Sequence, residues 1–172
     1  PMRQSALRLL SELRATRLTE DHKPASESER KRIEQLGGEV DLPSGGIGPA
    51  RVKGLATSRS FGGLARRPLV SAEPDLRVHP LDPQRDVFVV LASDGIWDVL
   101  EDQLVIDLVW EQISSVQDWR QGPASALAEA AEQVVQAALE RGSLDNLTCV
   151  VLLLSWDHCS SEECSAFGRS GS

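Results

Sequence analysis

The chain has 172 residues, of which 41% are hydrophobic, and this is enough to bury the core of a single domain. Its formal net charge of −8 argues against a nucleic-acid-binding surface and favours cations or basic partners. No apolar run reaches the ~18 residues of a membrane span, and no signal peptide stands at the start. We therefore expect a monomer that is neither inserted into a membrane nor secreted.

The cysteines do not form a disulfide or zinc pattern. There are three of them, an odd number, and Cys149 lies in an apolar run. Cys159 and Cys164 lie in a polar tail, residues 157–172, which we expect to be disordered. Their spacing is unlike that of a zinc site. We expect reduced thiols and, with them, a cytoplasmic or nuclear location.

The first part of the chain predicts one helix between less regular segments. Residues 1–16 are basic and lightly amphipathic, and we treat them as an atypical N-terminal segment. Residues 25–36 predict a helix, which the pair Gly37-Gly38 ends. The Gly- and Pro-rich residues 41–49 then predict a loop.

The next segment changes from an alternating to an irregular pattern. Residues 51–57 alternate polar and apolar side chains, which predicts a half-buried strand. Residues 58–69 hold a Gly pair and a Pro, which predicts an irregular surface excursion. Within it, Arg66 and Arg67 could attract a phosphorylated substrate, although exposed basic pairs are usually solvated surface.

The second half of the chain predicts two strands with two helices between them. The six apolar residues 87–92 are typical of a buried strand, and the apolar run 147–154 predicts another. Asp102 can cap one helix, and Pro123 can stand in the first turn of a second helix that Gly142 ends. The expected buried positions are Val105, Leu108, Val109 and Ile113 in the first helix, and Leu127, Ala131, Val134 and Ala138 in the second.

Two aspartates stand at opposite ends of the two apolar runs. Asp94 follows residues 87–92, and Asp145 precedes residues 147–154. If the strands are antiparallel neighbours, the end of the first meets the start of the second, so the two carboxylates face each other. Close carboxylates repel each other unless a hard cation such as Mg²⁺ or Mn²⁺ lies between them. The alternative is that each Asp is only a turn or cap residue.

Six motifs stand in the order found in one protein family. Among them are Asp21-His22-Lys23-Pro24 and the segment Ser93-Asp94-Gly95 with its flanking residues. Together they make the chain, from about residue 17 to residue 154, resemble the metal-dependent serine/threonine phosphatases of the protein phosphatase 2C (PP2C, or PPM) family. The motifs occupy residues 18–24, 32–38, 51–62, 71–75, 91–99 and 141–148.

The resemblance implies an α+β fold and a metal-dependent hydrolysis. The family fold is an α-β-β-α sandwich of two antiparallel sheets flanked by helices, of which residues 17–156 would be the C-terminal part. A complete site holds two Mg²⁺ or Mn²⁺ ions, and a metal-activated water attacks the phosphorus of phosphoserine or phosphothreonine. By motif, Asp94 and Asp145 match metal ligands, and Asp98 matches a residue beside metal-bound water or a weak third metal. Arg59 matches the start of the flap, which shapes substrate access, although it could instead be a structural Arg that bonds loop carbonyls.

The sequence also departs from the family pattern. The Asp-Gly-His-Gly-Gly motif, whose Asp bridges both metals, is absent, and so is the phosphate-binding Arg. We expect these residues in an N-terminal half that the resemblance does not cover. Gly63 stands where the family usually has Asp after Phe-Gly. Two hypotheses follow: a PP2C-type phosphatase acting on phosphorylated proteins, or a truncated, inactive PP2C-like remnant that serves as a binding or regulatory module.

Overall fold

The computed structural model describes residues 13–46, 48–116 and 124–154, which form two compact units. Unit 1 contains the described residues from 80 onward together with residues 13–16, and unit 2 spans residues 17–79. The tail 157–172 and most of the segment 1–16, for which we made predictions, lie outside the described residues. No helix in the described ranges is long and apolar enough to cross a membrane.

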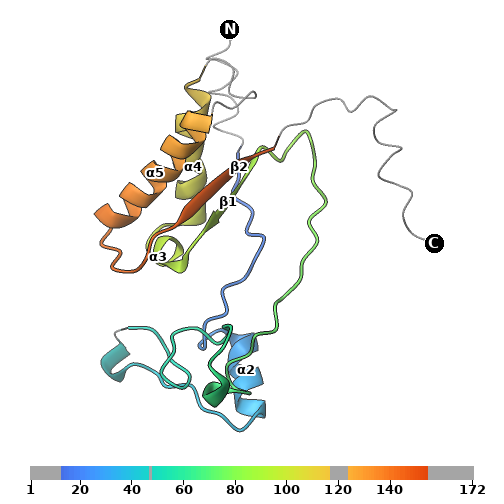
Figure 1. The fold of residues 1–172 in the computed structure, drawn as a ribbon, viewed down its shortest axis with the longest axis vertical. Helices are drawn as coiled ribbons and strands as arrows, with labels where there is room; N and C mark the ends of the chain where they lie inside the picture. Colours follow the sequence, from blue (N-terminus) through green and yellow to red (C-terminus); the bar gives the residue numbers. More distant parts are fainter. Residues whose placement is uncertain (1–12, 47, 117–123, 155–172) are drawn as a thin grey trace, which may run out of the picture. The chain divides into compact units, whose positions relative to one another are not determined.

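The sheet of unit 1 consists of the two strands that the sequence predicted. β1 (Phe88–Ala92) pairs antiparallel with β2 (Cys149–Leu153), and Val90 lies opposite Val151. The two strands lie side by side next to α4 and α5 (Figure 1). This confirms that the two apolar runs are antiparallel neighbours. The end of β1 therefore meets the start of β2.

Two long helices cover one face of this sheet. α4 (Asp102–Ser114) packs against α5 (Ala124–Glu140), and α5 packs against β2 (Figure 1). Of the predicted buried positions, five are buried, whereas Leu108, Leu127 and Ala131 are only partly buried against the same core. The five are Val105, Val109, Ile113, Val134 and Ala138. The buried core of unit 1 consists of Ile96, Leu100, Val105, Val109, Trp110, Ile113, Ala130, Val134, Ala138 and Val151.

The other face of the sheet is also apolar but exposed. Leu91 of β1 is 53% exposed, and Val150 and Leu152 of β2 are 45% and 49% exposed. Side chains alternate between the two faces of a strand, so these residues point away from the helical core. The uninterrupted apolar runs predicted strands that are buried on both faces. In the described residues the helical core covers one face, and the prediction is wrong for the other face, which is exposed.

Unit 2 is built around a short helix with a defined end. α2 (Glu27–Gln35) ends in a Schellman motif, in which Gly37 N–H bonds Glu34 O and Gly38 N–H bonds Ile33 O. Gly37 has φ 75°, a left-handed conformation that favours glycine. The helix expected over residues 25–36 is thus confirmed. Its Ile33 packs with the buried apolar residues Val52, Leu69 and Val70.

The strand predicted over residues 51–57 was wrong. Val52 and Leu55 exchange two backbone hydrogen bonds of 2.9 and 3.0 Å across a tight turn. The central residues Lys53 and Gly54 both have positive φ, 48° and 81°, as a type I′ turn requires. The alternating pattern did indicate that Val52 is buried, but the turn reverses the chain before a strand can form. The excursion 58–69 is irregular as predicted, apart from the one-turn helix η2 (Leu64–Arg66).

Candidate metal centre

The first of the two sequence-predicted metal ligands starts a helical turn directly after β1. α3 (Asp94–Trp97) begins with Asp94, whose carboxylate stands in the first turn, where a negative charge is favourable. Asp98 follows the helix, and its N–H bonds Asp94 O at 2.8 Å. Asp94 and Asp98 are both exposed. Trp97 is partly buried against the core of unit 1 and donates its indole N–H to Ala92 O at 3.0 Å.

Ser93 joins the end of β1 to the loop that carries Asp145. Its Oγ donates to Asn146 O at 2.8 Å and accepts the N–H of Thr148 at 3.1 Å. Its backbone N–H also bonds Thr148 O at 3.0 Å. Asp145 itself is exposed, and its Oδ1 accepts the N–H of Asn146 at 2.7 Å. A single serine therefore fixes the backbone on both sides of Leu147 relative to Asp94.

Gly95 brings the two loops still closer. It is buried, and its carbonyl accepts the hydroxyl of Ser143 at 2.7 Å. A Cβ atom at this position would lie 2.6 Å from Asn146 O, 3.0 Å from a methyl of Leu147 and 3.2 Å from Cβ of Asp145. Only glycine allows this approach. The residue after Asp94 thus lies against the backbone of Asn146, the residue after Asp145, as the predicted antiparallel pairing requires.

The donors that unit 1 brings to this end of the sheet are the carboxylates of Asp94 and Asp145, and they suit a hard cation. In the described ranges, no group of three or more His, Cys, Asp or Glu side chains is placed to hold a metal ion. The roles of Ser93 and Ser143 were not predicted from the sequence. Their positions close to Asp94 and Asp145 could have indicated that they hold the two loops together.

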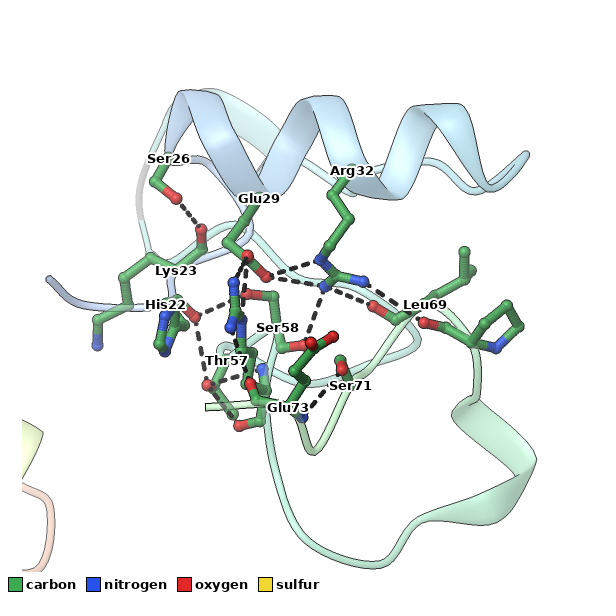
Figure 2. A network of polar contacts seen from close by, with 12 residues as sticks. His22, Lys23, Ser26, Glu29, Arg32, Thr57, Ser58, Leu69, Ser71 and Glu73 are labelled. Carbon is green, nitrogen blue, oxygen red and sulfur yellow. Dashed lines mark hydrogen bonds and ion pairs between the residues drawn. The ribbon is translucent and has the colours of Figure 1, made fainter. Parts of the chain in front are cut away.

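Arg59, the predicted flap residue, belongs to unit 2, where it is bound to a buried carboxylate. Glu29 of α2 is only 1% exposed. Its two oxygens accept Nη2 of Arg59 at 2.6 Å and Nη2 of Arg32 at 2.8 Å. Figure 2 shows Glu29 and Arg32 side by side over Ser58 and Leu69. Burial alone would raise the pKa of Glu29, but the hydrogen bonds from Arg59 and then Arg32 outweigh it and lower the pKa to about 2.

The network continues from Arg59 to the chain beyond the flap motif. Arg59 Nη1 donates to Glu73 O and to Oδ1 of Asp75, both at 2.8 Å. Nε2 of His22 lies 2.8 Å from the other oxygen of Asp75. Hydrogen bonding from His22, and then from Arg59, lowers the pKa of Asp75. In unit 2, Arg59 cross-links α2 to residues 73–75, so it has a structural role. Its role in substrate access stays a prediction.

A family model described as protein phosphatase 2C matches residues 6–147. The chain belongs to the protein phosphatase 2C family. The match includes Asp94, Asp145 and all of unit 2. It begins at residue 6, before residue 17, where the resemblance predicted from the motifs begins, and it ends at residue 147, before the predicted end at residue 154. The predicted α+β fold is the fold of PP2C proteins, and this chain contains a part of that fold.

Individual relatives agree with this assignment. The chain is 39% identical to the rice (Oryza sativa subsp. japonica) protein "Probable protein phosphatase 2C 44", over 80% of this chain and 39% of that protein. It is 38% identical to "Protein phosphatase ppm-1.A" of Caenorhabditis elegans, over 78% of this chain and 28% of that protein. A solved structure titled "Structure of a C.elegans sex determining protein" matches with a TM-score of 0.65 and 31% identity, covering 79% of this chain and 31% of that one.

A second solved structure, a phosphatase from a pathogenic strain of Toxoplasma gondii, matches with a TM-score of 0.62 and 28% identity. The match covers 81% of this chain and 42% of the solved chain. Among the curated relatives, the covered share ranges from 26% to 39%. The chain therefore spans about a third of the length of the curated relatives it matches.

Proposed function

We propose that a longer protein containing this chain hydrolyses phosphoserine and phosphothreonine in other proteins with the help of Mg²⁺ or Mn²⁺. The observation that carries the proposal is the close approach of Gly95 to the backbone of Asn146, the residue after Asp145. It brings the end of β1, with Asp94, to the start of its antiparallel neighbour β2, with Asp145. Two carboxylates near each other are unfavourable without a compensating positive charge. Membership of the PP2C family supports this chemistry.

Each residue of this centre has a distinct proposed role. Asp94 and Asp145 hold one of the two cations through their carboxylates, and Asp98 orients solvent beside it or holds a weaker third ion. Ser93 and Gly95 keep the two loops together, so that the carboxylates need no rearrangement before they bind a cation. The bound metals lower the pKa of water and neutralise charge on the phosphoryl group.

The proposal predicts weak or absent activity for the 172-residue chain by itself. The sequence does not contain the family motif with the bridging Asp, nor the phosphate-binding Arg. Sites with few protein ligands bind divalent cations with dissociation constants of about 10⁻⁴–10⁻³ M or weaker. Robust Mn²⁺-dependent hydrolysis of a phosphothreonine peptide by this chain alone would contradict the proposed ligand set.

The decisive experiment is a metal titration of the rate in the longer protein. Asp145→Asn keeps the side-chain size but removes the charge that holds the cation, so we expect most activity to be lost. Asp98→Asn is expected to lower turnover more than metal affinity. Glu111→Gln, on the exposed side of α4, is the matched control and should change neither. Equal, small losses for the Asp145 and Asp98 variants would mean that neither carboxylate is at the metal centre.

The same experiment separates the alternative function. An inactive PP2C-like remnant that only binds phosphoproteins would show no metal-dependent hydrolysis, even in the longer protein. We further propose phosphoproteins as substrates, a monomeric state and a cytoplasmic or nuclear location. Reduced thiols support that location, and in the described residues Cys149 is a free cysteine. One relative, however, is named a mitochondrial member of the family, and fluorescence microscopy of the tagged longer protein tests the compartment.

A further inference from the structure

One segment of unit 2 has a charge opposite to that of the chain as a whole. Residues 51–67 contain five basic residues and no Asp or Glu, whereas the whole chain has 26 acidic residues and a net charge of −8. One of the five, Arg59, is bound to Glu29 and Asp75. The other four are all exposed. We call these four residues, Arg51, Lys53, Arg66 and Arg67, the basic surface.

Backbone contacts bring the basic surface together. Nε of Arg66 donates to Lys53 O at 3.2 Å, so η2 lies against the tight turn at residues 52–55. Nη1 of Arg51 donates to Gly54 O at 2.9 Å in the same turn. Arg67 follows Arg66 directly, and its N–H bonds Leu64 O. The tight turn and η2 are separate segments of the chain, and these contacts bring Arg51, Lys53 and Arg66 together, with Arg67 next to Arg66 in the sequence.

The turn presents Lys53 in an unusual backbone conformation. Its φ of 48° is in the left-handed region, which a residue with a side chain adopts at a cost of about 1 kcal/mol or more. Lys53 is the only non-glycine residue with positive φ in the described part of the chain. Asn, Asp and Gly are the usual residues at this position of a type I′ turn. The sequence instead has a cation at the tip of the turn.

The basic surface differs from the other positive charges of unit 2 in its partners. In the described residues, no ion pair involves any of its four members, and the side chains of Arg51 and Arg66 donate to backbone carbonyls instead. Arg30 pairs with Glu34 and Lys31 pairs with Glu27, which is the usual arrangement of charges on a solvated helix. Carboxylates also pair with Arg17, Arg32, Arg59 and Arg77. The basic surface therefore lacks the carboxylate partners that these other cations of unit 2 have.

Gly63 is one reason why the basic surface has no carboxylate partner. The sequence has Gly where the resembled family usually has Asp, and a Cβ atom there would lie 3.8 Å from Nη1 of Arg66. An Asp at this position could therefore pair with Arg66. Two exposed apolar side chains belong to the same excursion, because Phe61 is 94% exposed and Leu64 is 79% exposed. Exposed aromatic and apolar groups beside arginines are typical of peptide-binding surfaces.

We propose that the basic surface binds an acidic peptide segment of a phosphoprotein substrate. The inference deepens the proposed phosphatase function, on which it rests, by naming the class of substrate. Carboxylates and phosphates accept hydrogen bonds from guanidinium groups in a matched geometry, and Phe61 and Leu64 offer apolar contact to the same segment. The negative charge of the whole chain does not prevent this, because exposed charges are screened over about 8 Å at physiological ionic strength.

Peptide binding to the 172-residue chain, measured by fluorescence anisotropy without added metal, tests the proposal. The probe is a phosphothreonine peptide flanked by glutamates, compared with the same peptide flanked by lysines. The double variant Lys53→Asn with Arg67→Gln removes two exposed charges and leaves the side-chain contacts of Arg51 and Arg66 in place. Asn tolerates the left-handed turn. Arg14→Gln with Arg85→Gln, two exposed residues of unit 1, is the control with the same change in net charge.

We expect the acidic peptide to bind more tightly than the basic one, with an affinity that falls as salt is added. The double variant should weaken binding of the acidic peptide about fivefold, and the control should not. Gly63→Asp should also weaken it, because the new carboxylate competes for Arg66. Equal affinity for both peptides, or equal loss in the control, would overturn the proposal. So would a dimer of the chain that the double variant dissociates while peptide affinity stays unchanged.

These outcomes are independent of the metal centre. Binding is measured without turnover, and Asp94 and Asp145 are intact in every variant. If the acidic peptide binds as expected but Asp145→Asn leaves hydrolysis by the longer protein unchanged, the proposed metal centre fails alone. If Asp145→Asn abolishes hydrolysis but the two peptides bind equally, only the basic surface fails.

Discussion

Gly95 and Asn146 lie so close together that a methyl group on Gly95 would be 2.6 Å from the backbone oxygen of Asn146. Distances below 3.0 Å are almost never seen for a Cβ atom, and here the neighbour is backbone. It cannot move aside as a flexible side chain would. The separation of the loops that carry Asp94 and Asp145 is therefore fixed by the absence of one side chain.

We predict that Gly95→Ala destabilises unit 1 by about 2–3 kcal/mol, because overpacking against a backbone atom forces the loops apart. Urea unfolding followed by tryptophan fluorescence measures this, since Trp97 and Trp110 lie in unit 1. Gly142→Ala is the control. Its Cβ would meet open space, but its φ of 84° would be strained, at a cost of about 1 kcal/mol. A smaller loss for Gly95→Ala than for Gly142→Ala would show that the contact is relieved at little cost.

The elements of unit 1 could be predicted because each has a strong local signal. β1 and β2 are uninterrupted apolar runs, and the apolar spacing of α4 and α5 matches the helical period. The pairing of the strands followed from the mirrored positions of Asp94 and Asp145. The turn at residues 52–55 could not be predicted, since alternation is equally compatible with a strand, and Lys is rare at positive φ.

The contacts of the candidate site were less predictable than its elements. The carboxylates at positions 94 and 145 stand next to Gly and Asn in the sequence, which is a visible signal. The pairing of Glu29 with Arg59 was not visible, because the two residues are thirty positions apart and nothing in their local sequences links them. Burial of a Glu on a short charged helix becomes apparent only in three dimensions.

Glu29 makes the stability of unit 2 sensitive to acid. Its pKa is lowered from 4.5 to about 2 by Arg59 and Arg32, against the effect of burial. A carboxyl whose pKa is depressed in the folded state stabilises the fold above its unfolded pKa. That contribution, on the order of 3 kcal/mol, is lost as the pH falls from about 4.5 to about 2.

We therefore expect the amides of α2 to lose protection against hydrogen exchange between pH 4.5 and pH 2, after correction for the intrinsic exchange rates. In Glu29→Gln, protection should be lower at neutral pH, and much of the loss in this pH window should be absent. Glu34→Gln, an exposed member of the same helix, should behave as the unmodified chain does. Identical acid profiles for the Glu29→Gln variant and the unmodified chain would contradict the assignment.

Cys149 is predicted to be unreactive in the folded chain. Burial raises the pKa of its thiol to about 11, so little of the nucleophilic thiolate is present at neutral pH. Alkylation by iodoacetamide, located by mass spectrometry, should modify Cys149 slowly in buffer and rapidly in urea. Equal rates under the two conditions would mean that the start of β2 opens frequently.

The two faces of β2 should respond differently to the same substitution. Val151 is 8% exposed and packs opposite Val90 on the helix-covered face, whereas Val150 is 45% exposed on the other face. Removal of two buried methyl groups leaves a cavity, so we expect Val151→Ala to lower the free energy of unfolding by about 2 kcal/mol. Val150→Ala should lower it by less than about 1 kcal/mol, because its methyl groups are already partly in water. Both variants change β-propensity equally, so the difference between their urea midpoints reports burial alone. Equal losses would mean that the exposed face is covered when the chain is in solution.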